Sequence, residues 1–234
     1  MFNVIKKTEY WQALDTKNVY NALKGGQRAL DGLKHIQDFW MMNQLIRSTG
    51  QKICEVGGAN SRILPVLQAR NECWNLDEFK GAGNGPTLLD KIEGVKNIFA
   101  NLGDFSSDLP ENHFDIIFSI SVIEHIPLAD MCKFWEDQYR VMKRGGKALH
   151  VIDIYIGDNP NINLERKIDL YIAEPIKFGF CFIDEILLKR PVVFNCDMAS
   201  NSDWGMWRWN KISPLLAENR ATNQSVSLAV VLQK

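Results

Sequence analysis

The sequence predicts an α/β protein built on a mostly parallel sheet, and three observations carry that prediction. From residue 51 onward, short apolar runs alternate with amphipathic segments of about a dozen residues, which is typical of strand–helix–strand units. Several runs are apolar throughout, as in strands that are buried on both faces. The chain has 234 residues, of which 46% are hydrophobic and 24% charged, values that suit one large globular domain.

The first 50 residues are expected to be helical and to form an addition to the main domain, which spans residues 51–234. Gly50 ends a stretch at 34–47 in which apolar residues recur at helical spacing, namely Ile36, Phe39, Trp40 and Ile46. A helix is expected at 61–69. The strands of the first half of the domain are expected at residues 52–56, 72–76, 96–100 and 114–119.

The second half of the domain continues the alternation. An amphipathic helix is expected over residues 129–142, followed after a glycine pair by a strand at 147–154. Another helix covers 163–174 and is expected to end at Pro175, because proline lacks the amide that continues a helix. The remaining strands are expected at 192–196 and 225–233, with a Trp- and Asn-rich insertion between them at about 197–223.

Charge and cysteine content narrow the classes of partner. The chain has 27 basic and 28 acidic residues and no basic cluster, which argues against a nucleic-acid partner. Its five cysteines form no CxxC pair and indicate buried small side chains in a reducing, cytoplasmic compartment. The first residues carry no apolar signal segment, and no apolar run reaches the roughly 18 residues of a membrane span, so no membrane partner is expected.

The turn after the first strand of the main domain carries the strongest ligand signal. Glu55 lies near the end of that strand, and Gly57 and Gly58 follow it. Small residues at the carboxyl end of a parallel strand let a ligand approach the backbone closely. Asp77 ends the next strand 20 residues after Gly57, the spacing at which a carboxylate accepts hydrogen bonds from ribose hydroxyls. The sequence therefore predicts a ligand that contains a nucleoside.

A dinucleotide fits this turn poorly. The GxGxxG pattern needs glycines at positions 57, 59 and 62, but Ala59 and Arg62 occupy the last two. Glu55 beside the turn would repel a pyrophosphate and attract a cationic amino group. These features favour a ligand with a ribose and an ammonium group but no phosphate, and S-adenosylmethionine fits that description.

Five motifs in this order resemble those of class I S-adenosylmethionine-dependent methyltransferases, over roughly residues 50–155 and the closing strand. Residues 55–61 resemble the acid-x-Gly-x-Gly-x-Gly turn, although Ala59 and Ser61 stand where glycines are usual. Asp77 resembles the ribose-binding acid, and Gly103-Asp104-Phe105 resembles the segment whose acid meets the adenine amino group. Residues 114–126 resemble the fourth-strand motif. Residues 142–147 resemble the turn before strand five, in which Arg144 replaces the usual proline.

The resemblance implies a seven-stranded, mostly parallel Rossmann-like sheet with helices on both faces, a last antiparallel strand, and added N-terminal helices. It also implies S-adenosyl-L-methionine as the cofactor. The residues expected to hold that cofactor are Glu55, Gly57, Gly58, Asn60, Asp77, Asp104, Phe105 and Ser119.

Methyl transfer to a small-molecule acceptor is the expected function, with a sugar or another hydroxyl or carboxyl compound as the leading candidate. An alcohol must lose its proton near the transition state, and His125 and Asp153, at the expected ends of strands four and five, are the candidate bases. Three aromatic residues of the insertion are candidates for stacking on the acceptor, namely Trp204, Trp207 and Trp209.

Alternative interpretations stay open for several of these features. Glu124-His125 can be a structural part of its motif, and no metal is expected there because Ser121 replaces the first acid of a Glu-x-x-Glu-His site. The tryptophan segment can be a hydrophobic plug, in which case the acceptor pocket is sought around Tyr155 and Tyr171. The whole chain can be an RNA methyltransferase on the same fold, or a non-catalytic module that only binds the cofactor.

Overall fold

The sheet determines where every other element lies. A computed structural model describes residues 1–6, 9, 33–80, 87, 92–194 and 224–234. Its eight-stranded sheet has the order β1-β8-β6-β5-β2-β3-β4, and β7 (Cys181–Phe182) pairs with β8. The parallel strands are β2 (Lys52–Val56), β3 (Glu72–Leu76), β4 (Val95–Ile98), β5 (Phe114–Ile120) and β6 (Met142–Ile156). The strands β8 (Gln224–Gln233) and β1 (Phe2–Val4) complete the sheet in antiparallel pairings.

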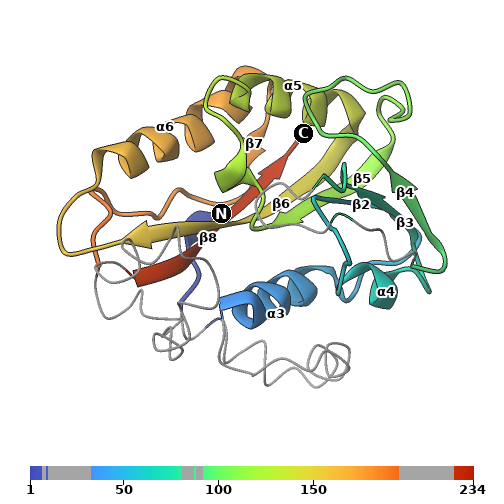
Figure 1. Cartoon of the computed structure of the whole chain (residues 1–234), viewed down its shortest axis with the longest axis horizontal. Helices are drawn as coiled ribbons and strands as arrows, with labels where there is room; N and C mark the ends of the chain where they lie inside the picture. Colours follow the sequence, from blue (N-terminus) through green and yellow to red (C-terminus); the bar gives the residue numbers. More distant parts are fainter. Residues whose placement is uncertain (7–8, 10–32, 81–86, 88–91, 195–223) are drawn as a thin grey trace.

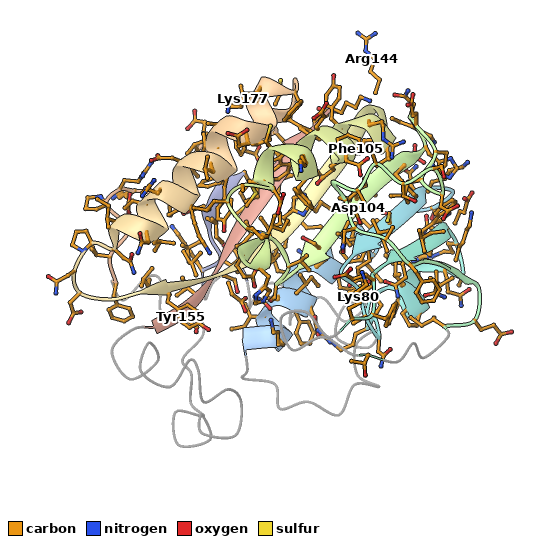
Figure 2. All side chains as sticks on the ribbon, turned by 45° about the horizontal axis from the view of Figure 1, so that its top comes forward. Lys80, Asp104, Phe105, Arg144, Tyr155 and Lys177 are labelled. Carbon is orange, nitrogen blue, oxygen red and sulfur yellow. The ribbon has the colours of Figure 1, made fainter. Side chains whose placement is uncertain are left out.

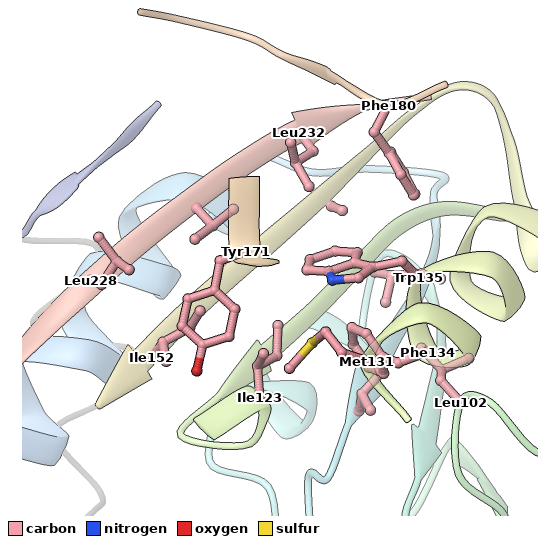
Figure 3. Packing of buried hydrophobic residues seen from close by; sticks show 14 of the residues in the cluster. Leu102, Ile123, Met131, Phe134, Trp135, Ile152, Tyr171, Phe180, Leu228 and Leu232 are labelled. Atoms are coloured by element: carbon pink, nitrogen blue, oxygen red, sulfur yellow. The ribbon is translucent and has the colours of Figure 1, made fainter. Parts of the chain in front are cut away.

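Helices cover both faces of the sheet (Figure 1). On one face lie α3 (Leu33–Leu45) and the short α4 (Leu64–Leu67), and on the other lie α5 (Met131–Val141) and α6 (Ile162–Lys177). Because side chains alternate along a strand, β6 contributes Val151 to the apolar cluster under α3 and Ile152 to the cluster under α5 and α6. Figure 3 shows the second cluster, in which Trp135 and Tyr171 are almost fully buried.

The order of the strands reverses beside β2. The chain passes from β2 to β3 and β4 on one side, then returns to β5 and β6 on the other. In open parallel sheets, ligands bind at the carboxyl ends of the strands that flank such a switch point. Those ends are paired in register here, with Glu55 opposite Phe118 and Val56 opposite Ser119.

The architecture confirms the predicted parallel sheet with helices on both faces and an antiparallel last strand, and the bounds of β2 and β3 coincide with their prediction. The main order of the sheet holds seven strands, and the two-residue β7 pairs with β8 as an eighth. The division of the chain at residue 50 stays a prediction, and the described part of residues 1–50 packs directly on the sheet through α3 and β1.

Several predicted elements differ from the structure. The helix expected at 61–69 is reduced to α4, because the Ser61 hydroxyl accepts the amides of Ile63 and Leu64 in the preceding turn. The first residues, expected to be helical, begin with strand β1, whose Phe2 and Val4 alternate inward. The strand expected at 147–154 is longer, because β6 begins at Met142.

The segment around α6 also differs. Pro175 lies inside the last turn of the helix, where it removes one hydrogen bond while its own carbonyl accepts the amides of Phe178 and Phe180. Residues 192–194 are not a strand, because the Val192 amide donates to the Glu165 carboxylate and not to a neighbouring strand. In the part of the chain that the structure describes, no helix has the length and apolar character needed to cross a bilayer.

Candidate functional site

A cavity of about 820 Å³ opens at the carboxyl ends of the strands beside the switch point. Its walls come from the turn after β2, the residues that follow β3 and β4, the segment after β5, and the start of α3. Most of the site residues predicted from sequence line this cavity, namely Glu55, Gly57, Gly58, Asn60, Asp77, Asp104 and His125.

The turn after β2 has a backbone that few residues can adopt. Gly57 has a φ of 62°, and a Cβ at that position would lie 2.5 Å from the Cγ2 of Val122. Ala59 is also left-handed, with a φ of 47°, although it carries a side chain. Its amide donates to the Asp77 carboxylate at 3.0 Å, which holds the turn against the end of β3. Alanine therefore keeps the conformation for which glycine is usual, at the cost of local strain.

Glu55 is a buried acid in the wall of the cavity. It is 5% exposed, and the Ser61 hydroxyl donates a hydrogen bond to its carboxylate. Burial raises the pKa of Glu55 to about 8, although Arg62 nearby acts in the other direction. The Arg62 guanidinium is bound to both carboxylate oxygens of Asp38 on α3. Glu55 thus has no ion-pair partner among the described residues, and an ammonium group entering the cavity would supply one.

Two further carboxylates stand where the nucleoside of the cofactor was expected. Asp77 accepts the amides of Ala59 at 3.0 Å and Phe79 at 2.7 Å, one on each oxygen. Each oxygen keeps a second acceptor site, and the pair can serve the two ribose hydroxyls. Asp104 lines the cavity after β4 and lies toward the same edge of the sheet as Lys80 in Figure 2. The residues that are present therefore fit S-adenosylmethionine.

Two residues predicted to bind the cofactor lie elsewhere. The Ser119 hydroxyl points into the core, 2.8 Å from Nδ1 of His150, and is fully buried. His150 in turn contacts Gln138, and burial lowers its pKa to about 3, so this network is neutral and internal. Phe105 is 43% exposed, and its amide donates to Asp137 outside the lining of the cavity. Cofactor contact by these two side chains stays a prediction.

The far end of the cavity carries a polar network that joins α3 to β5 and β6. Asp153 accepts hydrogen bonds from Nζ of Lys34 at 3.2 Å, from the Ser121 hydroxyl at 3.0 Å, and from the side-chain amide of Gln37. Gln37 also donates to the Ser227 hydroxyl at 3.0 Å. Sequence reasoning named Asp153 but missed Lys34 and Gln37, because nothing in the pattern of α3 indicates which strand ends its polar residues reach.

Ser121 holds the centre of this network in a strained conformation. Its φ is 57°, in the left-handed region, directly after β5. Its hydroxyl lies 2.9 Å from Oε1 of Gln37, and its amide donates to the Val151 carbonyl on β6. Strain of this kind persists only where the surroundings fix it, and it is found at functional sites.

His125 lies at the end of the 3-10 helix η2 (Ile123–His125) and lines the cavity. Its side chain is 53% exposed, and partial burial lowers the pKa of the imidazole, which is therefore neutral at pH 7. Asp153 does not line the cavity, although it belongs to the same polar region. Within the described ranges, His, Cys, Asp and Glu side chains form no group of three that could hold a metal ion. Trp204, Trp207 and Trp209 lie outside the described residues.

Comparison with known proteins agrees with this geometry. Residues 57–150 match a family described as a methyltransferase domain. No curated protein matches the chain. Many solved structures share its fold, among them a protein assigned as a sarcosine dimethylglycine methyltransferase from Galdieria sulphuraria. That protein has 14% identity and a TM-score of 0.57, over 94% of this chain and 98% of its own.

Two further structures are similar at the level of the fold. The cyclopropane synthase MmaA2 from Mycobacterium tuberculosis has 12% identity and a TM-score of 0.56, over 99% of both chains. Phosphoethanolamine N-methyltransferase 2 from Haemonchus contortus, solved with S-adenosylhomocysteine, has 16% identity and a TM-score of 0.52, over 95% of this chain and 59% of its own. Residues 57–150 thus match a methyltransferase domain on this fold, and the switch-point cavity with its three carboxylates fits S-adenosylmethionine as the cofactor.

Proposed function

We propose that the chain methylates a hydroxyl group of a small polar molecule, such as a sugar or a hydroxy acid, with His125 as the general base. When bound, S-adenosylmethionine supplies an electrophilic methyl group. The observation that carries the proposal is a neutral, half-exposed imidazole in the wall of the cofactor cavity, beside the end of β5. A hydroxyl acceptor needs such a base, whereas an amine that enters as the free base does not.

The contacts of the two candidate bases favour His125 over Asp153. Three side chains donate hydrogen bonds to the Asp153 carboxylate, and these contacts occupy its oxygens. The His125 imidazole makes no side-chain hydrogen bond to any described residue, so its nitrogens can meet an acceptor. We therefore assign Asp153 to anchoring α3 and His125 to taking the proton from the hydroxyl.

The cofactor half of the proposal assigns one group to each carboxylate. Glu55 would meet the amino group of the methionine moiety, Asp77 the ribose hydroxyls, and Asp104 the adenine amino group. Gly57, Gly58 and Asn60 would form the floor under the methionine moiety. Trp204, Trp207 and Trp209 remain the proposed stacking residues for the acceptor.

The test is a screen for labelled product with S-adenosylmethionine that carries a tritiated methyl group. The acceptor pools are sugars and sugar phosphates, hydroxy acids, primary and secondary amines, and purified RNA, each with wild-type protein and with His125→Gln. We expect label in a hydroxyl-bearing small molecule, and loss of that label in the variant. Label in RNA would support the RNA methyltransferase alternative. Label in an amine that persists in His125→Gln would overturn the hydroxyl assignment.

A further inference from the structure

Glu124 is a buried acid that the cofactor site does not use. It precedes His125 in η2, and its side chain is only 11% exposed. Both of its carboxylate oxygens are buried and make no hydrogen bond of ordinary geometry to a described residue, although the backbone amides of Glu124 and Asp153 act weakly on the carboxyl. Leaving a buried polar group unpaired costs about 1–3 kcal/mol, so its presence calls for an explanation.

The groups around Glu124 come from three other elements, β6, α3 and α6. Asp153 on β6 and Lys34 on α3 act on its carboxyl electrostatically, and Tyr171 on α6 lies close enough to respond to it. Lys167 on α6 donates to the backbone carbonyl of Glu124 at 3.1 Å, which fixes the turn from outside. Burial, the largest effect, raises the pKa of Glu124 well above its usual range, which favours the neutral carboxylic acid.

The imidazole of His125 offers the hydrogen-bond donor that the Glu124 carboxyl lacks. Its Nε2 lies 3.9 Å from Oε1 of Glu124, within ion-pair range but too far for a hydrogen bond. The charged groups that act on the imidazole are Asp153, Lys34 and Lys167. Because the imidazole also lines the cavity, a contact between Nε2 and the buried acid would leave Nδ1 for a ligand. Distances of this kind tighten when a site fills.

We propose that Glu124 is the positioning residue for His125. The carbonyl oxygen of the Glu124 side chain accepts a hydrogen bond from Nε2–H of the imidazole, and Nδ1 is thereby kept for the acceptor hydroxyl. The inference rests on the proposed function. The oxygen of the acceptor would bond to the methyl carbon as the bond from that carbon to sulfur breaks and S-adenosylhomocysteine leaves. The hydroxyl proton would pass to Nδ1, and the imidazolium would keep its Nε2 hydrogen bond to Glu124. Glu124 needs no charge for this role and exchanges no proton.

If Glu124 acts as a neutral hydrogen-bond acceptor, two substitutions at this position should have different effects. Glu124→Gln keeps a neutral side chain with a carbonyl oxygen, whereas Glu124→Leu has similar bulk and no acceptor. Glu174 offers a matched control, because it is another buried acid with an unpartnered oxygen, on α6 beside Lys177 and away from His125. Glu174→Gln tests whether loss of any such acid disturbs the protein.

The experiment is a pH titration of the histidine ring signals by NMR with S-adenosylhomocysteine bound, in which His125→Gln assigns the His125 signal. We expect Glu124→Leu to lower the pKa of His125 by about one unit, since the imidazolium loses its acceptor. We expect Glu124→Gln and Glu174→Gln to leave the His125 pKa within about 0.3 units of wild type. Unchanged His125 values in Glu124→Leu would overturn the proposal.

Two further outcomes keep the inference separate from the proposed function. If Glu124→Gln lowers the His125 pKa as much as Glu124→Leu does, the acid acts through its charge and the neutral-acceptor role is wrong. If Glu124→Leu shifts the pKa as expected while His125→Gln retains full methyl transfer, Glu124 positions His125 but His125 is not the base. Calorimetric binding of S-adenosylhomocysteine to each variant verifies that the cofactor site is intact.

Discussion

The two ends of the cavity are built in different ways. At the cofactor end, the contacts join residues that are near in sequence, as in the 18-residue separation of Ala59 and Asp77 and the 6-residue separation of Glu55 and Ser61. At the far end, beside the polar network, Lys34 meets Asp153 across 119 residues, and Gln37 meets Ser227 across 190. The first end is a local turn that one segment specifies, and the second exists only after distant parts of the chain have packed together.

The largest expected effect tests the local end. Asp77→Ala should weaken binding of S-adenosylhomocysteine by about 1.5–3 kcal/mol, because the ribose loses its acceptor and the turn loses the bond to Ala59. Isothermal titration calorimetry measures the change, with Asp108→Ala as an exposed acid outside the cavity lining for control. Equal affinities of Asp77→Ala and wild type would remove the ribose assignment.

The next variant tests the end that is assembled from distant segments. Gln37 is fully buried and bridges Asp153 and Ser227, so Gln37→Leu should lower the free energy of unfolding by about 1–3 kcal/mol. Lys34→Met should cost less than about 1 kcal/mol, because the Lys34 side chain is 41% exposed. Urea denaturation compares the two. If Lys34→Met proved the more damaging, the buried amide would not be what anchors α3.

A third prediction concerns protons at the local end. At pH 7 the free protein holds a proton on Glu55, whose pKa is about 8. A bound ammonium group favours the carboxylate, so cofactor binding should release up to about one proton, and affinity should rise with pH until about pH 8. Without ligand the sign is the opposite for stability, since a raised folded pKa means that stability is lost as pH rises through about 8.

Calorimetry of S-adenosylhomocysteine binding at pH 7, in two buffers with different ionisation enthalpies, counts the protons released. Glu55→Gln should release none, because an amide does not titrate in this range. Proton uptake by the wild-type protein would contradict the ammonium assignment.

The smallest expected effect comes from Ala59. Its left-handed backbone costs a residue with a Cβ about 1 kcal/mol, so Ala59→Gly should stabilise the protein by up to that amount. Thermal unfolding measures this effect. A lower melting temperature in Ala59→Gly would show that the methyl group is held by contacts that offset the strain.

The same contrast explains what the sequence could predict. Glu55, Gly57 and Asp77 were found because a strand, a turn and a second strand leave a fixed spacing, and the structure places all three at one cavity. Ser119 was named from its place near the end of β5, which does not reveal that its side chain faces the core and His150. Ser121, two positions later, would share that face in a regular strand, but it follows the end of β5 with a φ of 57° and contacts Asp153 instead.

Other elements could not be read from local patterns. Strand β1 is three residues long, and only its partner β8 distinguishes it from the start of a helix. Residues 192–194 read as a strand, but Glu165 takes the amide that a neighbouring strand would need. In both cases the local structure depends on contacts with residues outside the segment itself, and the periodicity of apolar residues within the segment does not report such contacts.

The position of β8 between β1 and β6 has a consequence for the order in which the protein can be made. A ribosome delivers β1 and α3 before the parallel strands, but the strand that pairs with β1 and carries Ser227 emerges after them. The parallel strands β2 to β6, with the cofactor turn, can pair before then. During most of synthesis, the apolar face of α3 therefore lacks the part of its packing surface that β8 supplies. Chaperones bind nascent chains while they expose apolar surface in this way.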